Sequence, residues 1–132
     1  LENTLRETKE LFKNHYQEKI MHMIVDSYLI NGKSFNSFEK DLISKEFCLI
    51  INFISIPNNF SHQIEKTLEK YQIKVNRFID KSYIVNFFKN EEIEYPLMIY
   101  KILNGINENE VQLVPKNKQK KGFFEKFFQL FS

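Results

Sequence analysis

The sequence is poor in the residues that most often mark cross-linking and phosphate binding. Its 132 residues include one cysteine, three glycines, three prolines and no tryptophan. The single cysteine, Cys48, excludes an internal disulfide, and its place in the apolar run 47–56 predicts a buried, inert thiol in a reducing cytoplasm. Gly32, Gly105 and Gly122 are too far apart to build a phosphate-binding loop. We therefore expect no nucleotide to be bound.

Patterns typical of catalysis and metal binding are also scarce. His15, His22 and His62 share no ligand spacing with one another or with Cys48, so they do not indicate a zinc site. Hydrogen-bonded or solvated side chains explain His22 and His62 more simply. The glutamates within 91–94 are more typical of a solvated face than of an acid–base pair. We expect no enzyme, with no catalytic residues, metal ligands or cofactors.

Long hydrophobic runs are absent too. No stretch has the roughly 18–20 consecutive apolar residues that span a bilayer, and the first ten residues do not resemble a secretory signal. The composition, 42% apolar and 27% charged, is that of one folded globular domain. Because the chain begins with Leu1 rather than methionine, a fragment of a longer product remains one hypothesis.

Charge is distributed unevenly along the chain. Residues 116–132 hold five lysines against one glutamate, a net +4, which leaves residues 1–115 with 14 basic and 16 acidic residues, a net −2. A general affinity for nucleic acid is therefore not expected of the body of the chain. The positive charge is confined to the basic run (residues 116–121) and to Lys126.

The terminal segment (residues 122–132, GFFEKFFQLFS) follows the basic run directly. At about 100° per residue, its large apolar side chains fall within an arc of roughly 160°. A lysine-rich run followed by such a helix is typical of a segment that lies in a membrane interface. The predicted membrane-binding residues are Phe123, Phe124, Phe127, Phe128, Leu130, Phe131, Lys116, Lys118, Lys120, Lys121 and Lys126.

Two other partners for this segment remain open. Its apolar face could lie in a protein groove or dock onto the domain itself. The lysines could also contact nucleic-acid phosphates, with the aromatic rings as stacking platforms. An anionic membrane surface is favoured because the aromatic residues form one helical stripe. Each lysine near an anionic leaflet contributes on the order of 1 kcal/mol.

Periodicity in the first half of the chain predicts four elements. Residues 2–16 carry an apolar stripe and i,i+4 charge pairs, which predict a helix. Strand formers from 19 to 30 end at an Asn-Gly turn signal, and 33–44 is expected to be a loop or a single helical turn. The apolar run 46–56 predicts a central buried strand.

The second half is expected to hold three helices and one strand. A helix over 59–72, a strand over 73–79 and helices over 82–90 and 96–104 follow from the spacing of apolar residues. Asn104-Gly105 is expected to end the last helix in a left-handed conformation. The prediction is an α+β domain (1–105) with about three strands and the 59–72 helix on one face, a lysine-rich linker (106–121) and a detached amphipathic helix (122–132).

Several strings resemble the FtsA family, the actin-like proteins that tether bacterial division filaments to the membrane. The resemblance begins at 19–32, where Ile20, His22, Tyr28 and Asn31-Gly32 hold places matched in the family. It continues through the strand, helix and Gln-Ile-Lys-Val string of 49–75, the helix and acidic turn of 80–94, the helix of 96–105 and the terminal lysine- and phenylalanine-rich segment.

The sequence also departs from that family. Asp26 replaces an expected proline, the loop at 33–44 lacks the family's turn, and the Asp-x-Gly-x-Gly-Thr phosphate loop after the helix at 82–90 is missing. What remains resembles the small inserted subdomain, joined almost directly to the membrane-targeting helix, without the ATPase core. The resemblance implies a non-enzymatic adaptor on the cytoplasmic face of the inner membrane, with division proteins or a second copy of the chain as partners. The alternatives are a small nucleic-acid-binding module and a non-functional fragment of a longer ATPase.

Overall fold

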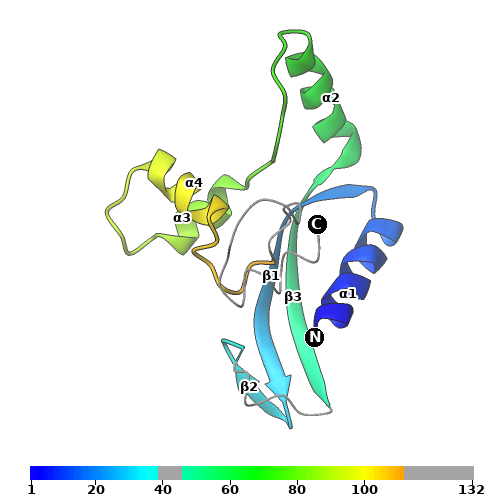
Figure 1. Cartoon of the computed structure of the whole chain (residues 1–132), viewed down its shortest axis with the longest axis vertical. Coiled ribbons are helices and arrows are strands. Elements are labelled where there is room, and N and C mark those ends of the chain that lie inside the picture. The colour runs from blue at the N-terminus through cyan, green and yellow to red at the C-terminus, as the bar shows by residue number, and fades with distance from the viewer. Residues whose placement is uncertain (39–45, 112–132) are drawn as a thin grey trace.

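The computed structural model describes residues 1–38 and 46–111, and its fold is α+β, as expected from the sequence (Figure 1). The described residues form one open sheet of three antiparallel strands, together with four helices. In chain order the elements are α1 (Glu2–His15), β1 (Glu18–Ile30), β2 (Lys33–Phe35), β3 (Phe47–Pro57), α2 (Asn58–Glu69), α3 (Lys81–Phe87) and α4 (Tyr95–Leu103).

The sheet has the order β2-β1-β3, with the long strand β1 in the centre. Asn31 and Gly32 take positive φ values of 51° and 75° between β1 and β2. Two such residues turn the chain back on itself with the twist that a hairpin needs. Residues 33–35 therefore pair with β1, from Tyr28↔Phe35 to Ile30↔Lys33. The expectation of a loop or helical turn over the whole of 33–44 is wrong for these three residues.

The pairing of β1 with β3 separates the sheet into two faces. Met23 lies opposite Phe53, Val25 opposite Ile51 and Tyr28 opposite Leu49. The register of the pairing shifts between Ile20 and His22 and between Val25 and Ser27. The second shift keeps Tyr28 on the same face of the sheet as Met23 and Val25. Because side chains alternate along a strand, the apolar pairs share one face and the residues between them point to the other.

The first face is covered by α1. Leu5 is fully buried in one cluster with Met23, Val25 and Tyr28. Phe12 stacks on Phe53 with 4.4 Å between ring centroids. The sequence had assigned this cover to the 59–72 helix, which is wrong. α1 carries the i,i+7 pair Leu5 and Phe12 on one stripe, and that stripe meets the sheet.

Helix α2 projects beyond the end of the strands (Figure 1), and Ser61 is its only fully buried residue. It continues directly from β3, and an ion pair between Lys19 and Glu65, 2.7 Å long, also joins it to the sheet. The segment 73–79 returns from α2 in an extended form without belonging to the sheet, so the predicted strand there is wrong. Alternating apolar residues fit an extended chain but do not specify a pairing partner.

Helices α3 and α4 form a hairpin with an apolar cluster of its own. Ile84, Phe88 and Ile102 are buried together in it. The Asp80 carboxylate accepts a hydrogen bond of 2.7 Å from the backbone N–H of Tyr83 and so caps α3. Gly105 follows α4 with φ of +79°, which confirms the expected left-handed end of that helix.

The side chain of Cys48 is exposed, so the expectation of a buried thiol is wrong. It lies opposite Leu29 on β1, on the sheet face that α1 does not cover. A continuous apolar run suggests a central strand that is buried on both faces, but β3 is an edge strand with no fully buried residue, so that expectation is wrong. In the part of the chain that the structure describes, no helix is long and apolar enough to cross a bilayer.

Candidate functional site

The membrane-binding residues predicted from the sequence, which belong to 116–132, all lie outside the described residues. The structure does describe the residues that lead up to this part of the chain. We call Asn109–Val111 the root segment, because it holds the last described residues before the basic run. It brings together groups from β1, from the segment after α2, and from α3.

The root segment lies alongside β1 and joins it through one isolated antiparallel bridge. The Val25 N–H donates to the Asn109 carbonyl over 2.8 Å, and the Val111 N–H donates to the Met23 carbonyl over 2.8 Å. Ile24 and Glu110 form an antiparallel bridge between these two bonds. β2 pairs only with Tyr28–Ile30, so the root segment takes the part of that β1 edge that β2 does not reach.

Successive residues of the root segment point to opposite sides of the sheet. Val111 is fully buried in the cluster beneath α1 with Leu5 and Met23. Glu110 is 1% exposed and points to the other side, toward α3. The sequence had placed both residues in a linker beginning at 106, whereas the structure packs them into the body of the domain. The last described residues are therefore held in a fixed position in the domain.

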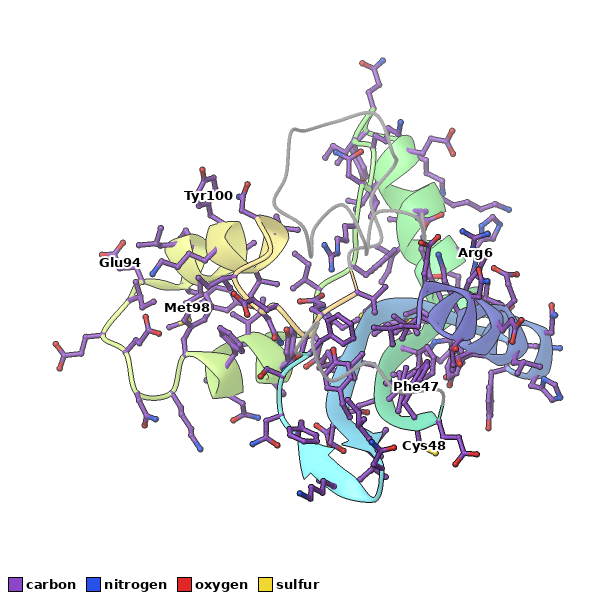
Figure 2. The ribbon with its side chains drawn as sticks, turned by 60° about the horizontal axis from the view of Figure 1, so that its bottom comes forward. Arg6, Phe47, Cys48, Glu94, Met98 and Tyr100 are labelled. Carbon is purple, nitrogen blue, oxygen red and sulfur yellow. The ribbon has the colours of Figure 1, made fainter. Side chains whose placement is uncertain are left out.

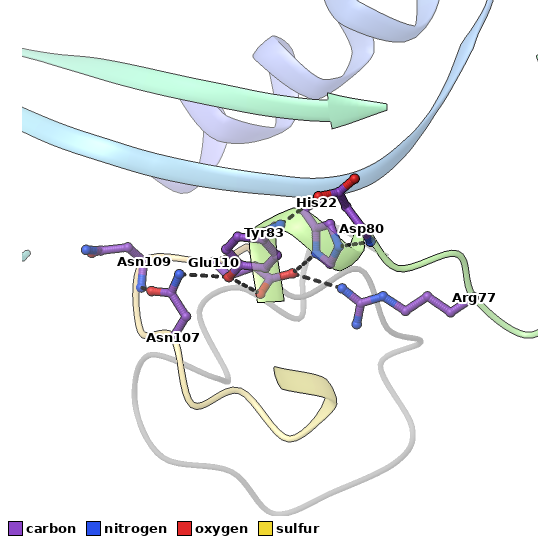
Figure 3. Close-up of polar contacts among 7 residues, drawn as sticks. All are labelled: His22, Arg77, Asp80, Tyr83, Asn107, Asn109 and Glu110. Atoms are coloured by element: carbon purple, nitrogen blue, oxygen red, sulfur yellow. Dashed lines mark hydrogen bonds and ion pairs between the residues drawn. The ribbon is translucent and has the colours of Figure 1, made fainter. Parts of the chain in front are cut away.

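Glu110 is the centre of a buried polar network (Figure 3). Its Oε1 atom accepts from His22 Nδ1 over 2.8 Å and from Arg77 Nη2 over 2.9 Å. Its Oε2 atom accepts from the Tyr83 hydroxyl over 2.8 Å. A buried carboxylate is tolerated when charge and hydrogen bonds compensate its lost hydration, and both oxygens have such partners here.

The hydrogen bonds of His22 define its tautomer. The backbone N–H of Asp80 donates to His22 Nε2 over 2.9 Å, so this nitrogen must act as an acceptor. The proton of the neutral ring then lies on Nδ1 and is donated to Glu110. His22 is fully buried and thereby joins the start of α3 to the root segment. This outcome agrees with the expected role of His22 as a hydrogen-bonded side chain.

Tyr83 closes the network on the side of the helical hairpin. Its hydroxyl donates to Glu110 and accepts from Asn107 Nδ2 over 2.9 Å. Burial raises the pKa of Tyr83 well above its ordinary value of 10.0, and the Glu110 carboxylate raises the pKa further. The phenol therefore stays protonated and remains a donor. Its ring also packs against that of His22, with 4.5 Å between centroids.

The network is arranged for support rather than for chemistry on a substrate. Both Glu110 oxygens and both His22 ring nitrogens are engaged by protein groups, and both side chains are buried. A general base needs a direct path to the proton that it removes, and none of these atoms faces solvent. Among the described residues, no group of three or more His, Cys, Asp or Glu side chains is placed to hold a metal ion.

Sequence reasoning missed Glu110, Arg77 and Tyr83 as a unit. They are far apart along the chain and show no motif spacing, because the fold alone brings them together. One signal was available at the root segment. Glu110 is followed by Val-Gln-Leu-Val, a string of strand formers that argues against a flexible linker starting at 106.

No family model, curated protein or solved structure matches this chain in the three comparisons that were made.

Proposed function

We propose that this chain is a non-enzymatic, membrane-tethered adaptor that binds protein partners through its α+β body and an anionic membrane surface through its terminal segment. The observation that carries the proposal is the fixed root segment. Glu110 and Val111 are buried and bonded on opposite sides of the sheet. They stand six and five residues before Lys116, the first lysine of the basic run, so the body would be held close to whatever surface that run binds.

The tether is reversible and peripheral in this proposal. The lysines supply electrostatic attraction to anionic lipids, and the phenylalanines supply apolar burial in the headgroup region. Neither contribution is large alone, and each is offset by the cost of ordering the segment. Two weak signals acting together give the stable but exchangeable attachment that an adaptor needs.

The role in bacterial cell division rests on the resemblance to the FtsA family. The body corresponds to the inserted subdomain of that family, and the terminal segment to its membrane-targeting helix. Partners would then be division proteins or a second copy of the chain, on the cytoplasmic face of the inner membrane. The absence of the family's phosphate-loop string from the sequence supports an adaptor role without ATP hydrolysis.

Vesicle co-sedimentation tests the membrane part of the proposal. The full chain should sediment with vesicles that contain phosphatidylglycerol, and a Phe127→Glu, Phe128→Glu variant should remain in the supernatant. Gln129→Ser, an uncharged change on the polar face of the same segment, is the matched control and should sediment like the unaltered chain. Retention of RNA or single-stranded DNA without vesicle binding would instead favour the nucleic-acid alternative.

A further inference from the structure

Helix α4 presents an apolar surface to solvent, which is unusual for a helix at the edge of a small domain. Leu97, Tyr100 and Leu103 are 45%, 63% and 38% exposed. They follow one another at i, i+3 and i+6, and we call this surface the α4 face. Figure 2 shows Tyr100 pointing away from the hairpin, whereas Met98 lies on its inner side. A solvent-facing helix surface is normally polar.

In the loop beside the α4 face acidic residues outnumber basic ones, and Lys101 on α4 itself pairs with Glu91 over 3.9 Å. Residues 89–94, which join α3 to α4, hold three glutamates and one lysine, a net −2. Glu91, Glu92 and Glu94 are all exposed, and Figure 2 shows Glu94 projecting from the start of α4. An apolar stripe next to an acidic loop is complementary to a segment that combines phenylalanines with lysines.

The chain itself carries such a segment. We propose that the α4 face and the acidic α3–α4 loop form the docking site for the chain's own terminal segment when no membrane is present. The apolar stripe Phe123–Phe131, as the helix that the sequence predicts, would be about 13 Å long, the same length as the nine residues of α4. The lysines of the basic run would lie beside the glutamates of the loop.

The length of the connection favours a contact within one molecule. Ten residues, 112–121, separate Val111 from the terminal segment. A flexible chain of that length spans about 17 Å on average and about 33 Å when extended. The root segment already lies beside the hairpin, because Glu110 bonds to Tyr83 on α3 over 2.8 Å. Short connections of this kind give effective concentrations in the millimolar range.

Docking would regulate the membrane tether, and this part of the inference rests on the proposed function. One apolar stripe cannot be buried against α4 and in a lipid interface at the same time. If about nine molecules in ten are closed in solution, the apparent affinity for vesicles falls about tenfold. Anionic lipid would open the molecule, since it competes with the glutamates for the lysines.

Paramagnetic NMR on the full chain tests the docking itself. Cys48→Ser with Ser132→Cys places one nitroxide label at the end of the terminal segment. We expect the amide signals of α4 and of residues 91–94 to broaden, and the broadening to disappear when Tyr100→Glu is added. Tyr71→Glu is the matched control, because Tyr71 is 72% exposed but lies far from α4 in sequence, next to α2. Absence of broadening at α4, or broadening that Tyr100→Glu leaves unchanged, would overturn the proposal.

A mixed sample and a vesicle assay complete the test. Broadening of an unlabelled, isotope-enriched chain by a separate nitroxide-labelled chain would show docking between molecules and overturn the intramolecular form. In co-sedimentation, Tyr100→Glu should strengthen binding to anionic vesicles by about three- to tenfold, opposite to the effect of an added negative charge by itself. If the α4 signals broaden but no variant binds vesicles, the docking stands and the proposed membrane role fails.

Discussion

A single residue, Glu110, holds the root segment in place. Glu110 accepts hydrogen bonds from His22, Arg77 and Tyr83, which come from three separate parts of the sequence. Replacing a buried charged hub removes several contacts at once and leaves its partners without compensation. The stability of the root segment should therefore depend on this one carboxylate more than on any exposed glutamate.

Glu110→Gln tests this dependence. The amide cannot accept from all three donors, and Arg77 loses its buried counter-charge, so we expect the free energy of unfolding to fall by about 3 kcal/mol. Urea denaturation followed by circular dichroism measures the change. Glu108→Gln is the matched control, because Glu108 is exposed two residues away, and it should change stability by less than about 0.5 kcal/mol. Equal effects of the two substitutions would contradict the role assigned to Glu110.

Buried tyrosines should make the protein sensitive to alkali. Burial raises the pKa of Tyr28 from 10.0 to about 12, and it also raises the pKa of Tyr83. At a pH between 10 and about 12, the Tyr28 hydroxyl has lost its proton in the unfolded chain but keeps it in the folded chain. Base therefore favours unfolding. The stabilising contribution is complete below pH 10 and is lost as the pH rises toward 12.

The free energy of unfolding is measured as a function of pH for the unaltered chain and for the Tyr28→Phe variant. Lysines also titrate in this range, but they do so in both proteins. The unaltered chain should lose more stability above pH 10 than the variant, with a constant difference below it. Parallel curves over the whole range would show that Tyr28 does not contribute.

At the scale of elements, local sequence signals predicted much of the fold. The pairing of strands that are distant in the sequence was predicted least well. The Asn31-Gly32 turn, the helices near 2–16 and 59–72, and the stop at Gly105 follow from short-range sequence rules. The identity of the third strand does not follow from such rules. Residues 73–79 have the strand composition, yet the three residues 33–35 pair with β1 because the tight turn brings them there.

The candidate site was predictable only in part, for the same reason. The basic run and the terminal segment are contiguous, so their pattern is visible in the sequence. The Glu110 network joins residues up to 88 positions apart, and no periodicity encodes such a contact. Val111 likewise becomes a core residue only because β2 is short enough to leave a free edge on β1.

The cap of α3 offers a test at this scale. Asp80 both caps α3 through its carboxylate and binds His22 through its backbone N–H. Asp80→Ala removes only the carboxylate contact and should lower the free energy of unfolding by about 1 kcal/mol, whereas Asp80→Asn should retain most of the stability. Ser82→Ala, at an exposed position in the same helix, is the control. An equal loss in the alanine and asparagine variants would argue against capping.

At the scale of the whole molecule, residues 1–115 carry a net charge of −2 and residues 116–132 a net charge of +4. Such a separation of charge allows one end to approach an anionic surface while the body remains available to partners. It also makes attachment depend on ionic strength, because exposed charges are screened by salt.

Salt dependence provides a prediction for the intact chain. Raising the ionic strength should release it progressively from phosphatidylglycerol vesicles. Replacing Lys118, Lys120 and Lys121 with glutamine should weaken binding at low salt and flatten the dependence, with a loss on the order of 1 kcal/mol per lysine. Replacing Lys66, Lys70 and Lys74 with glutamine is the control, because these lysines lie in or near α2. It should change neither the binding at low salt nor its dependence on salt. Binding that is insensitive to salt would mean that the basic run does not contribute.

The central claim is that the terminal segment holds an adaptor at the membrane of a dividing bacterium. A fluorescent fusion of the full chain, imaged with and without Phe127→Glu and Phe128→Glu, tests it most directly. The account predicts a band at mid-cell that becomes diffuse when both phenylalanines are replaced, at unchanged levels of intact protein. A diffuse signal from the unaltered chain, or a mid-cell band that survives both substitutions, would contradict it.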